Sequence, residues 1–273
     1  MSKAIKIVII VAVCAAVAVA AALAGYFGYI ATHKINAPDL FGDGVRYIAH
    51  RGLSSEYYEN TEAAFVAAAK SDFFFGIETD IYRTADGKYV CAHDENPFAD
   101  ESKTIDELSL AQCLSLPLSV SNDYDMPGEN ERLCSYERYL EICAEGGKTA
   151  VIEFKPAFTA EQVTEILAVA RQYLPEERIM VISFVDTNIG HLSEVADGIG
   201  FMYLGTNKVS AEFFARRGCP VGLNADKVKP SYIDRIHRLG VTLSVWNVKT
   251  AGQAAELVEG GIDFITTDFD FSA

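Results

Sequence analysis

Two carboxylates and an imidazole lie close together in the segment GIETDIYRTADGKYVCAHD. The dipeptide Asp86-Gly87 is a strong signal for a two-residue hairpin turn, which would place Asp80 opposite His93. Glu78 lies two residues before Asp80, so both side chains point to the same face of one strand. Carboxylates in an apolar strand are costly unless they are paired, and a bound metal ion would remove that cost. The alternative is a solvated, alternating edge strand.

A third carboxylate occurs further along the chain in AVIEFKP, where Glu153 and Lys155 share one face of a predicted strand. These two residues could form a simple ion pair, which would contribute little to stability. If this strand lies next to the first one, however, Glu78, Asp80 and Glu153 converge. Three oxygen ligands with open coordination positions suit Mg²⁺ or Ca²⁺ better than zinc.

A second imidazole and a guanidinium, His50 and Arg51, end the apolar strand in RYIAHRG. The two-residue period of a strand would place them on opposite faces, but Gly52 follows directly and permits a bend. Arg51 and Lys155 would then hold a phosphate group. One of His50 and His93 would take a proton from the nucleophile, and the other would give one to the leaving oxygen. With a metal that polarises the phosphoryl oxygen, these groups could cleave a phosphodiester.

A mainly parallel sheet must position these residues, because short apolar strands alternate with amphipathic helices after residue 45. Thr159 and Gln162 form a capping box, for example, before a predicted helix. About eight strands in roughly 230 residues favour a (β/α)8 TIM barrel over a doubly wound sheet, for which a glycine-rich phosphate loop is missing. We expect barrel strands at residues 47–49, 76–82, 150–154, 179–184, 201–204, 222–224, 243–248 and 264–267.

Two stretches interrupt the alternation between the second and third barrel strands. Residues 88–94 form an extra strand, and residues 95–148 form an insertion with predicted helices near 104–114 and 135–146. Insertions in barrels usually lie on the face that carries the active site, although loops that only cover the surface are also common.

The N-terminal segment is of a different kind. No charged residue lies between Ile7 and Ile30, and a helix of these 24 residues would span about 36 Å, enough to cross a hydrocarbon core of roughly 30 Å. A cleaved signal peptide is the alternative, but its apolar region is shorter, about 7–15 residues. We therefore predict a transmembrane anchor over residues 1–34, a linker over residues 35–44 and a catalytic barrel over residues 45–273.

Charge is distributed unevenly between these parts. Lys3, Lys6 and Lys34 are the charged residues of the first 34, and the remaining chain carries 20 basic and 38 acidic residues. The lysines before the apolar helix predict a single-pass membrane protein with a cytoplasmic N-terminus and an extracytoplasmic catalytic domain. The acidic domain argues against nucleic-acid binding, which needs a basic face. If the substrate is an anion, a metal ion or a local basic pair must hold it. The sequence implies no protein partner.

Six cysteines are present, and no two of them show the C-x-x-C spacing of a zinc site. We expect most of them to be free thiols in the core. A disulfide between Cys113 and either Cys134 or Cys143 remains open.

The motifs AHRG, ENTEAAF, IETDIYRTADGKYVCAHD, IEFK, SF, VWNV and GIDFITTD follow one another over residues 46–270. In content and order they resemble the glycerophosphodiester phosphodiesterase family. The resemblance implies a TIM barrel with an insertion between strands two and three. It also implies metal-dependent hydrolysis of glycerophosphodiesters to sn-glycerol 3-phosphate and an alcohol, a reaction of lipid and glycerol metabolism. The site residues that it implies are Glu78, Asp80 and Glu153 for the divalent cation, His50 and His93 for acid–base catalysis, Arg51 and Lys155 for the phosphate, and Trp246 near the glycerol or headgroup or, alternatively, in the core.

The chain departs from the family pattern in two places. Tyr58 stands where the family usually has a proline, and VWNVK, which contains Asn247, stands where it often has VWTVN. We expect neither residue to touch a catalytic group, and both to affect loop shape and substrate choice. Two other functions remain open: a related barrel phospholipase that acts on intact phospholipid, and a catalytically silent barrel that binds a phosphodiester.

Overall fold

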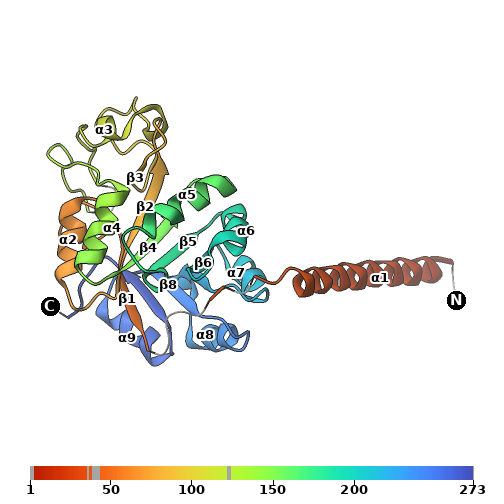
Figure 1. The fold of residues 1–273 in the computed structure, drawn as a ribbon. Helices are drawn as coiled ribbons and strands as arrows, with labels where there is room; N and C mark the ends of the chain where they lie inside the picture. Colours follow the sequence, from red (N-terminus) through yellow and green to blue (C-terminus); the bar gives the residue numbers. More distant parts are fainter. Residues whose placement is uncertain (1–2, 36, 39–43, 122–123, 273) are drawn as a thin grey trace.

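Eight parallel strands close into a barrel surrounded by helices in a computed structural model, described over residues 3–35, 37–38, 44–121 and 124–272 (Figure 1). The strands follow the order β1-β9-β8-β7-β6-β5-β4-β2, and pairing of β1 with β2 closes the barrel. This confirms the predicted TIM barrel and excludes the open sheet. The barrel strands are β1 (Arg46–Ala49), β2 (Gly76–Arg83), β4 (Thr149–Phe154), β5 (Ile179–Ser183), β6 (Gly200–Gly205), β7 (Val221–Asn224), β8 (Leu243–Val248) and β9 (Phe264–Thr267).

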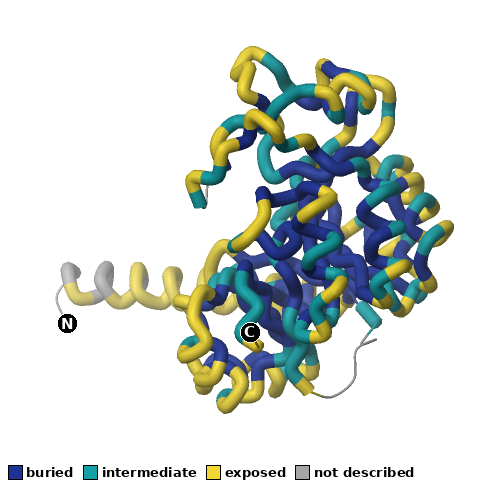
Figure 2. The backbone as a smooth tube through the Cα atoms, turned by 90° about the vertical axis from the view of Figure 1, so that its left-hand side faces the viewer, coloured by how far each residue is buried: buried dark blue, intermediate teal, exposed yellow. Residues whose placement is uncertain are grey.

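Helices cover the outside of the barrel and bury its strands. In Figure 2 the middle of the barrel domain is dark blue, for buried, and much of its periphery is teal or yellow, and the residues of β4, β5 and β6 are all buried. The capping box predicted from Thr159 and Gln162 is present at the start of the fifth helix. The outer helices are α2 (Glu62–Lys70), α4 (Tyr136–Glu145), α5 (Ala160–Ala170), α6 (Asp186–Val195), α7 (Lys208–Ala215), α8 (Pro230–His237) and α9 (Ala251–Glu259).

The barrel strands are apolar on both faces because one face meets the helices and the other fills the barrel interior. The larger core lies between strands and helices. A smaller interior cluster consists of Ile48, Val151, Met180, Ile182, Met202, Leu204 and Phe264. All of these residues except Phe264 also line the pocket described below.

The hairpin after β2 exists, but its predicted register is wrong. The extra strand is β3 (Tyr89–Cys91), which pairs antiparallel with the end of β2. The carbonyl of Asp80 accepts a hydrogen bond from the amide of Ala92, so Asp80 does not face His93. The loop has three residues instead of two and ends at Gly87, whose φ of +75° is the left-handed backbone that glycine favours. An Asp-Gly pair occurs in both loop types, and therefore the dipeptide alone did not settle the register.

The segment between β3 and α4 leaves the barrel and forms a lobe that carries α3 (Leu110–Cys113), at the top of Figure 1. A 3₁₀ turn (Ile105–Glu107) precedes α3, in place of the longer helix expected there. The helix expected near 135–146 is α4, which packs in the outer layer beside α2 and α5. The lobe has its own core, made by Tyr58, Val90, Ala92, Phe98, Ile105, Leu108, Cys113, Leu118 and Leu133.

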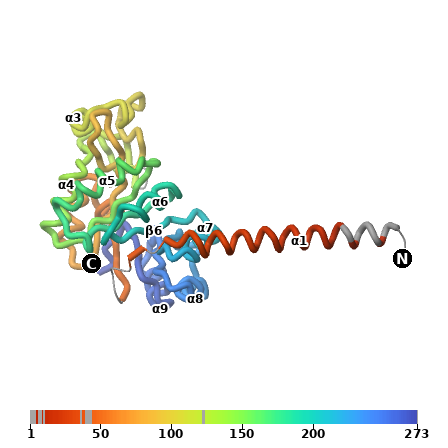
Figure 3. Tube along the Cα trace, turned by 45° about the vertical axis from the view of Figure 1, so that its right-hand side comes forward, coloured from red at the N-terminus to blue at the C-terminus, as the bar shows by residue number. Residues whose placement is uncertain are grey.

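A single long helix, α1 (Lys3–Thr32), projects away from the barrel (Figures 1 and 3). The part from Val11 to Thr32 is apolar, exposed, and long enough to cross a membrane or to act as a signal sequence. The end of α1 contacts the barrel: Tyr29 stacks on Phe213 of α7 and lies under the guanidinium of Arg217.

All six cysteines lie within the described residues and are free thiols, five of them buried. The disulfide left open above is therefore not formed. Burial raises the pKa of the Cys134 and Cys143 thiols to about 12, which keeps them protonated and unreactive.

Candidate active site

The three predicted metal ligands meet at the C-terminal end of the barrel, the face on which TIM barrels carry their active sites. Glu78 and Asp80 lie on β2, and Glu153 on the neighbouring β4 is the register partner of Asp80. One ligand atom of each lies within 4.8 Å of the others, and all three residues are buried. Nζ of Lys155 lies 3.2 Å from Oε1 of Glu153 and 3.4 Å from Oδ1 of Asp80. Glu153 and Lys155 are thus part of the cluster and not an isolated ion pair.

The electrostatics of this cluster fit a hard divalent cation. Burial, reinforced by Asp80 and Glu153, raises the pKa of Glu78 well above its ordinary value. Burial and Asp80 raise the pKa of Glu153 to about 7. Burial acts on the pKa of Asp80 in the same direction, but Arg51 and Lys155 outweigh it and lower that pKa. Oε1 of Glu78 is buried and has no hydrogen-bond partner among the described residues, so a cation would satisfy it.

The chain bends sharply after β1, as the glycine after His50 and Arg51 led us to expect. Arg51 adopts a left-handed φ of +56° and Gly52 a φ of +85°. The backbone amide of Arg51 donates to Oε2 of Glu78 at 2.9 Å. Nε of the Arg51 side chain lies 3.4 Å from Oδ2 of Asp80. Both His50 and Arg51 therefore reach the site, although a continued strand would have separated them.

Substitution of Gly52 tests this bend. A Cβ at Gly52 would lie 2.6 Å from the carbonyl carbon of Ala64, in addition to the strain of its φ. We expect Gly52→Ala to lower the free energy of unfolding by about 3 kcal/mol. The matched control is Gly240→Ala, where φ is +78° but nothing lies within 4 Å of the added Cβ, and it should cost about 1 kcal/mol. Urea denaturation measures both values, and equal losses would show that contact with Ala64 does not matter.

The residues of the ENT motif support the site from one side. Oε2 of Glu59 pairs with NH1 of Arg51 at 2.9 Å. Nδ2 of Asn60 donates to Oδ2 of Asp80 at 3.3 Å. Thr61 caps α2 through its side chain. Glu59 and Asn60 thus position the guanidinium and the central carboxylate, roles that the motif alone did not reveal.

His50 has partners that sequence reasoning missed. Its Nδ1 lies 2.7 Å from Oδ1 of Asp268, a fully buried carboxylate just after β9. Oδ2 of Asp268 accepts from the hydroxyl of Tyr124 at 2.7 Å and from Nδ2 of Asn247 at 2.6 Å. Nδ2 of Asn247 also lies 3.2 Å from Nδ1 of His50, so the expectation that Asn247 touches none of the predicted catalytic groups is wrong. The available signal was the aspartate that ends GIDFITTD.

His93 lies beyond the end of β3, and its Nδ1 is 3.1 Å from Oδ1 of Asp94. Burial lowers the pKa of His93, and Arg51 lowers it further, against the opposing effect of Asp80. His93 is therefore mostly neutral at pH 7 and can accept a proton.

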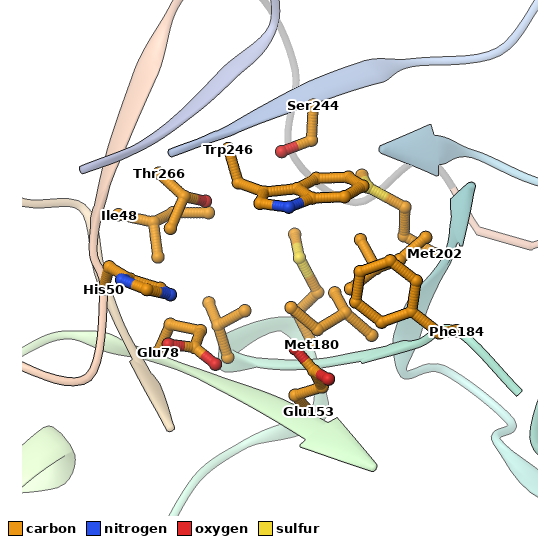
Figure 4. Close-up of a pocket in the computed structure, with 13 residues that line it drawn as sticks. Ile48, His50, Glu78, Glu153, Met180, Phe184, Met202, Ser244, Trp246 and Thr266 are labelled. Carbon is orange, nitrogen blue, oxygen red and sulfur yellow. The ribbon is translucent and has the colours of Figure 1, made fainter. Parts of the chain in front are cut away.

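A pocket beside the carboxylates has one polar and one apolar side (Figure 4). His50, Glu78 and Glu153 line the polar side. On the opposite side, Trp246 packs edge-on against Phe184, with ring centroids 5.2 Å apart. Trp246 also packs against the interior cluster, so its position suits substrate contact and core packing alike.

Residues 50–270 match the model of the glycerophosphoryl diester phosphodiesterase family. The chain belongs to this family. The match confirms the resemblance drawn from the motifs and identifies the chain as a phosphodiesterase. A glycerophosphodiester phosphodiesterase of Caldanaerobacter subterraneus subsp. tengcongensis is 26% identical over 234 residues, which cover 81% of this chain and 93% of that protein.

Solved structures share the fold of this phosphodiesterase. An Oleispira antarctica phosphodiesterase, solved in complex with the product sn-glycerol-3-phosphate, superposes with a TM-score of 0.70 at 20% identity and covers 82% of this chain and 92% of its own. A glycerophosphodiester phosphodiesterase from Parabacteroides distasonis has a TM-score of 0.65 at 22% identity, with 83% and 93% covered. These comparisons support the barrel fold.

Proposed function

We propose that this protein hydrolyses glycerophosphodiesters to sn-glycerol 3-phosphate and an alcohol, with one bound divalent cation and two histidines. The observation that carries the proposal is the meeting of three carboxylates, two basic side chains and a histidine–aspartate pair at one end of the barrel. The relative solved with sn-glycerol-3-phosphate supports the proposed product.

Arg51 and Lys155 would bind the phosphate group of the substrate. Arg51 and Lys155 place positive charge beside the pocket in a domain that is acidic overall, as an anionic phosphodiester requires. They would hold the non-bridging phosphate oxygens and orient the scissile bond. Glu78, Asp80 and Glu153 would hold the cation, either Mg²⁺ or Ca²⁺, which supplies further positive charge to a phosphoryl oxygen when it is bound.

The two imidazoles would move the protons. His93 is mostly neutral at pH 7 and suits the general base, which takes a proton from the attacking water molecule. His50, whose Nδ1 lies 2.7 Å from Oδ1 of the buried Asp268, would be the general acid that gives a proton to the leaving alcohol. Trp246 and Phe184 would contact the glycerol or the headgroup from the apolar side of the pocket.

The experiment is a product assay on the full chain in detergent. Release of sn-glycerol 3-phosphate is measured from glycerophosphocholine, glycerophosphoethanolamine and glycerophosphoglycerol, each with Mg²⁺, with Ca²⁺ and with EDTA. Cation-dependent release supports the proposal. The rates on the three substrates rank the headgroups, and the rates with Mg²⁺ and with Ca²⁺ identify the ion. Intact phosphatidylinositol and sphingomyelin are assayed in parallel by headgroup release, and cleavage of these lipids without cleavage of any of the three diesters would identify a phospholipase. No release from any diester by folded, cation-loaded protein would leave a silent binding barrel.

We also propose that α1 anchors the enzyme as a single-pass membrane helix over residues 1–34, joined to the catalytic barrel (45–273) by the linker 35–44. The exposed apolar surface of α1 supports an anchor, and Lys3 and Lys6 favour a cytoplasmic N-terminus with the barrel outside. The intact mass of the protein recovered from membranes distinguishes an anchor from a cleaved signal peptide.

A further inference from the structure

The carboxylate of Asp268 is buried and has a donor for each of its lone-pair positions. Oδ1 lies 2.7 Å from Nδ1 of His50 and accepts from the hydroxyl of Ser54 at 3.1 Å. Oδ2 accepts from Tyr124 and Asn247 at 2.7 and 2.6 Å. Four donors from three separate segments hold one carboxylate, so its position and orientation are strongly constrained.

This geometry determines which nitrogen of His50 carries a proton. Nδ2 of Asn247 carries two N–H groups and donates one of them to Oδ2 of Asp268. An unprotonated Nδ1 would place a nitrogen lone pair against a carboxylate oxygen at 2.7 Å, which is repulsive. His50 must therefore donate from Nδ1 to Asp268, and this leaves Nε2 for proton transfer in the pocket.

One of the four donors comes from the lobe and not from the barrel. The hydroxyl of Tyr124 reaches Asp268, and its ring packs edge-on against Phe269 with centroids 6.0 Å apart. The amide of Ser121 donates to the carbonyl of Met126, two residues after Tyr124.

Both departures from the family pattern belong to this arrangement. Tyr58, in place of the usual proline, donates its hydroxyl to the carbonyl of Ser119 at 3.1 Å, close to the segment that carries Tyr124. Asn247, in place of the usual threonine, donates directly to Asp268. The two residues are far apart in the sequence. Tyr58 makes a hydrogen bond to the lobe, and Asn247 makes one to the carboxylate of Asp268, which Tyr124 of the lobe also contacts.

We propose that Asp268 is the positioning residue of His50 and that Tyr124 and Asn247 hold its carboxylate in place, so that the lobe takes part in catalysis. This inference rests on the proposed function, in which His50 is one of the two proton-transfer groups. Asp268 and Tyr124 act through His50 and need not touch the substrate.

The first test is spectroscopic and needs no turnover. The full chain is labelled with ¹⁵N-histidine, and long-range ¹H–¹⁵N spectra are recorded at alkaline pH, with His50→Ala to assign one of the five histidines. We expect the Nδ1–H tautomer for His50. In Asp268→Asn the new amide can donate to Nδ1, so His50 should change to the Nε2–H tautomer. An Nε2–H tautomer in the wild type would overturn the proposal.

The second test is kinetic. We expect Asp268→Asn to lower kcat by about 10²–10⁴-fold with little change in KM, because proton transfer depends on the orientation of His50. Tyr124→Phe removes one hydroxyl group and should lower kcat by about tenfold, also with KM unchanged. The matched control is Tyr173→Phe, after α5 at the opposite end of the barrel, which should behave as the wild type.

The outcomes are distinct. A normal kcat in Asp268→Asn overturns the role of Asp268, and a Tyr124→Phe enzyme equal to the control overturns the role of the lobe. Uniform loss of activity and thermal stability in Asp268→Asn with an unchanged His50 tautomer also contradicts positioning. If the wild type hydrolyses no diester, the proposed function fails, while the tautomer spectra still decide whether Asp268 orients His50.

Discussion

Replacement of single carboxylates in the cation cluster should change the stability of the cation-free protein in opposite directions. In EDTA at pH 8, Glu153→Gln should be more stable than the wild type by about 2 kcal/mol, whereas Asp80→Asn should be less stable by about 3 kcal/mol. Both variants should lose cation-dependent hydrolysis by about 10³-fold, because each removes a ligand.

The opposite signs follow from the surroundings of the two groups. Asp80 lies 3.4 Å from both Nε of Arg51 and Nζ of Lys155, and removal of its charge leaves two mostly buried cations less compensated. Burial and the charge of Asp80 raise the pKa of Glu153 to about 7, so its ionisation works against folding. A neutral glutamine keeps an acceptor for Lys155 without that charge.

The pH dependence gives the sharper comparison. The pKa of Glu153 is raised in the folded protein, so the folded state retains a proton that the unfolded chain releases above pH 4.5. The stability of the cation-free wild type should therefore fall between about pH 5 and pH 7, and that of Glu153→Gln should fall less. Thermal unfolding in EDTA at pH 5 and pH 8 measures the difference.

The matched control for these variants is Glu259→Gln, an exposed carboxylate at the end of α9. It should match the wild type at both pH values in stability and in activity. A Glu153→Gln variant that is less stable than the wild type at pH 8 would contradict the electrostatic account of the cluster.

Removal of either imidazole is the second large effect. We expect His50→Ala and His93→Ala each to lower kcat on glycerophosphocholine by about 10²–10⁴-fold, the range typical of general acid–base groups. His191→Ala, on the outer helix α6, is the matched control and should keep full activity.

A substrate with a better leaving group separates the two roles. A glycerophosphodiester of p-nitrophenol releases a weakly basic phenolate that does not need a proton. His50→Ala should recover most of its activity on this substrate if His50 is the general acid, and His93→Ala should not. Recovery in His93→Ala alone would reverse the assignment, and recovery in neither would exclude a general acid among the two histidines.

Local sequence was sufficient to predict which reactive groups the site contains and where most of the barrel strands lie. The alternation of strands and helices predicts the barrel, and Gly52 predicts the bend that brings His50 and Arg51 to one site. The carboxylates of β2 and β4 could be paired because consecutive parallel strands in a barrel are neighbours. Such inferences hold because strand period and right-handed connections leave few other arrangements.

Only the tertiary structure decided the surroundings of the two histidines. Asp268 lies 218 positions from His50 in the sequence and reaches it because β1 and β9 are neighbours in the closed barrel. Tyr124 comes from a lobe whose loop conformations no strand or helix period predicts, and the hairpin register depended on one extra loop residue. The sequence by itself determined which reactive groups are present and on which strands they lie. Barrel closure and irregular loops determined which of these groups form hydrogen bonds with one another, because those contacts depend on distances between segments far apart in the chain.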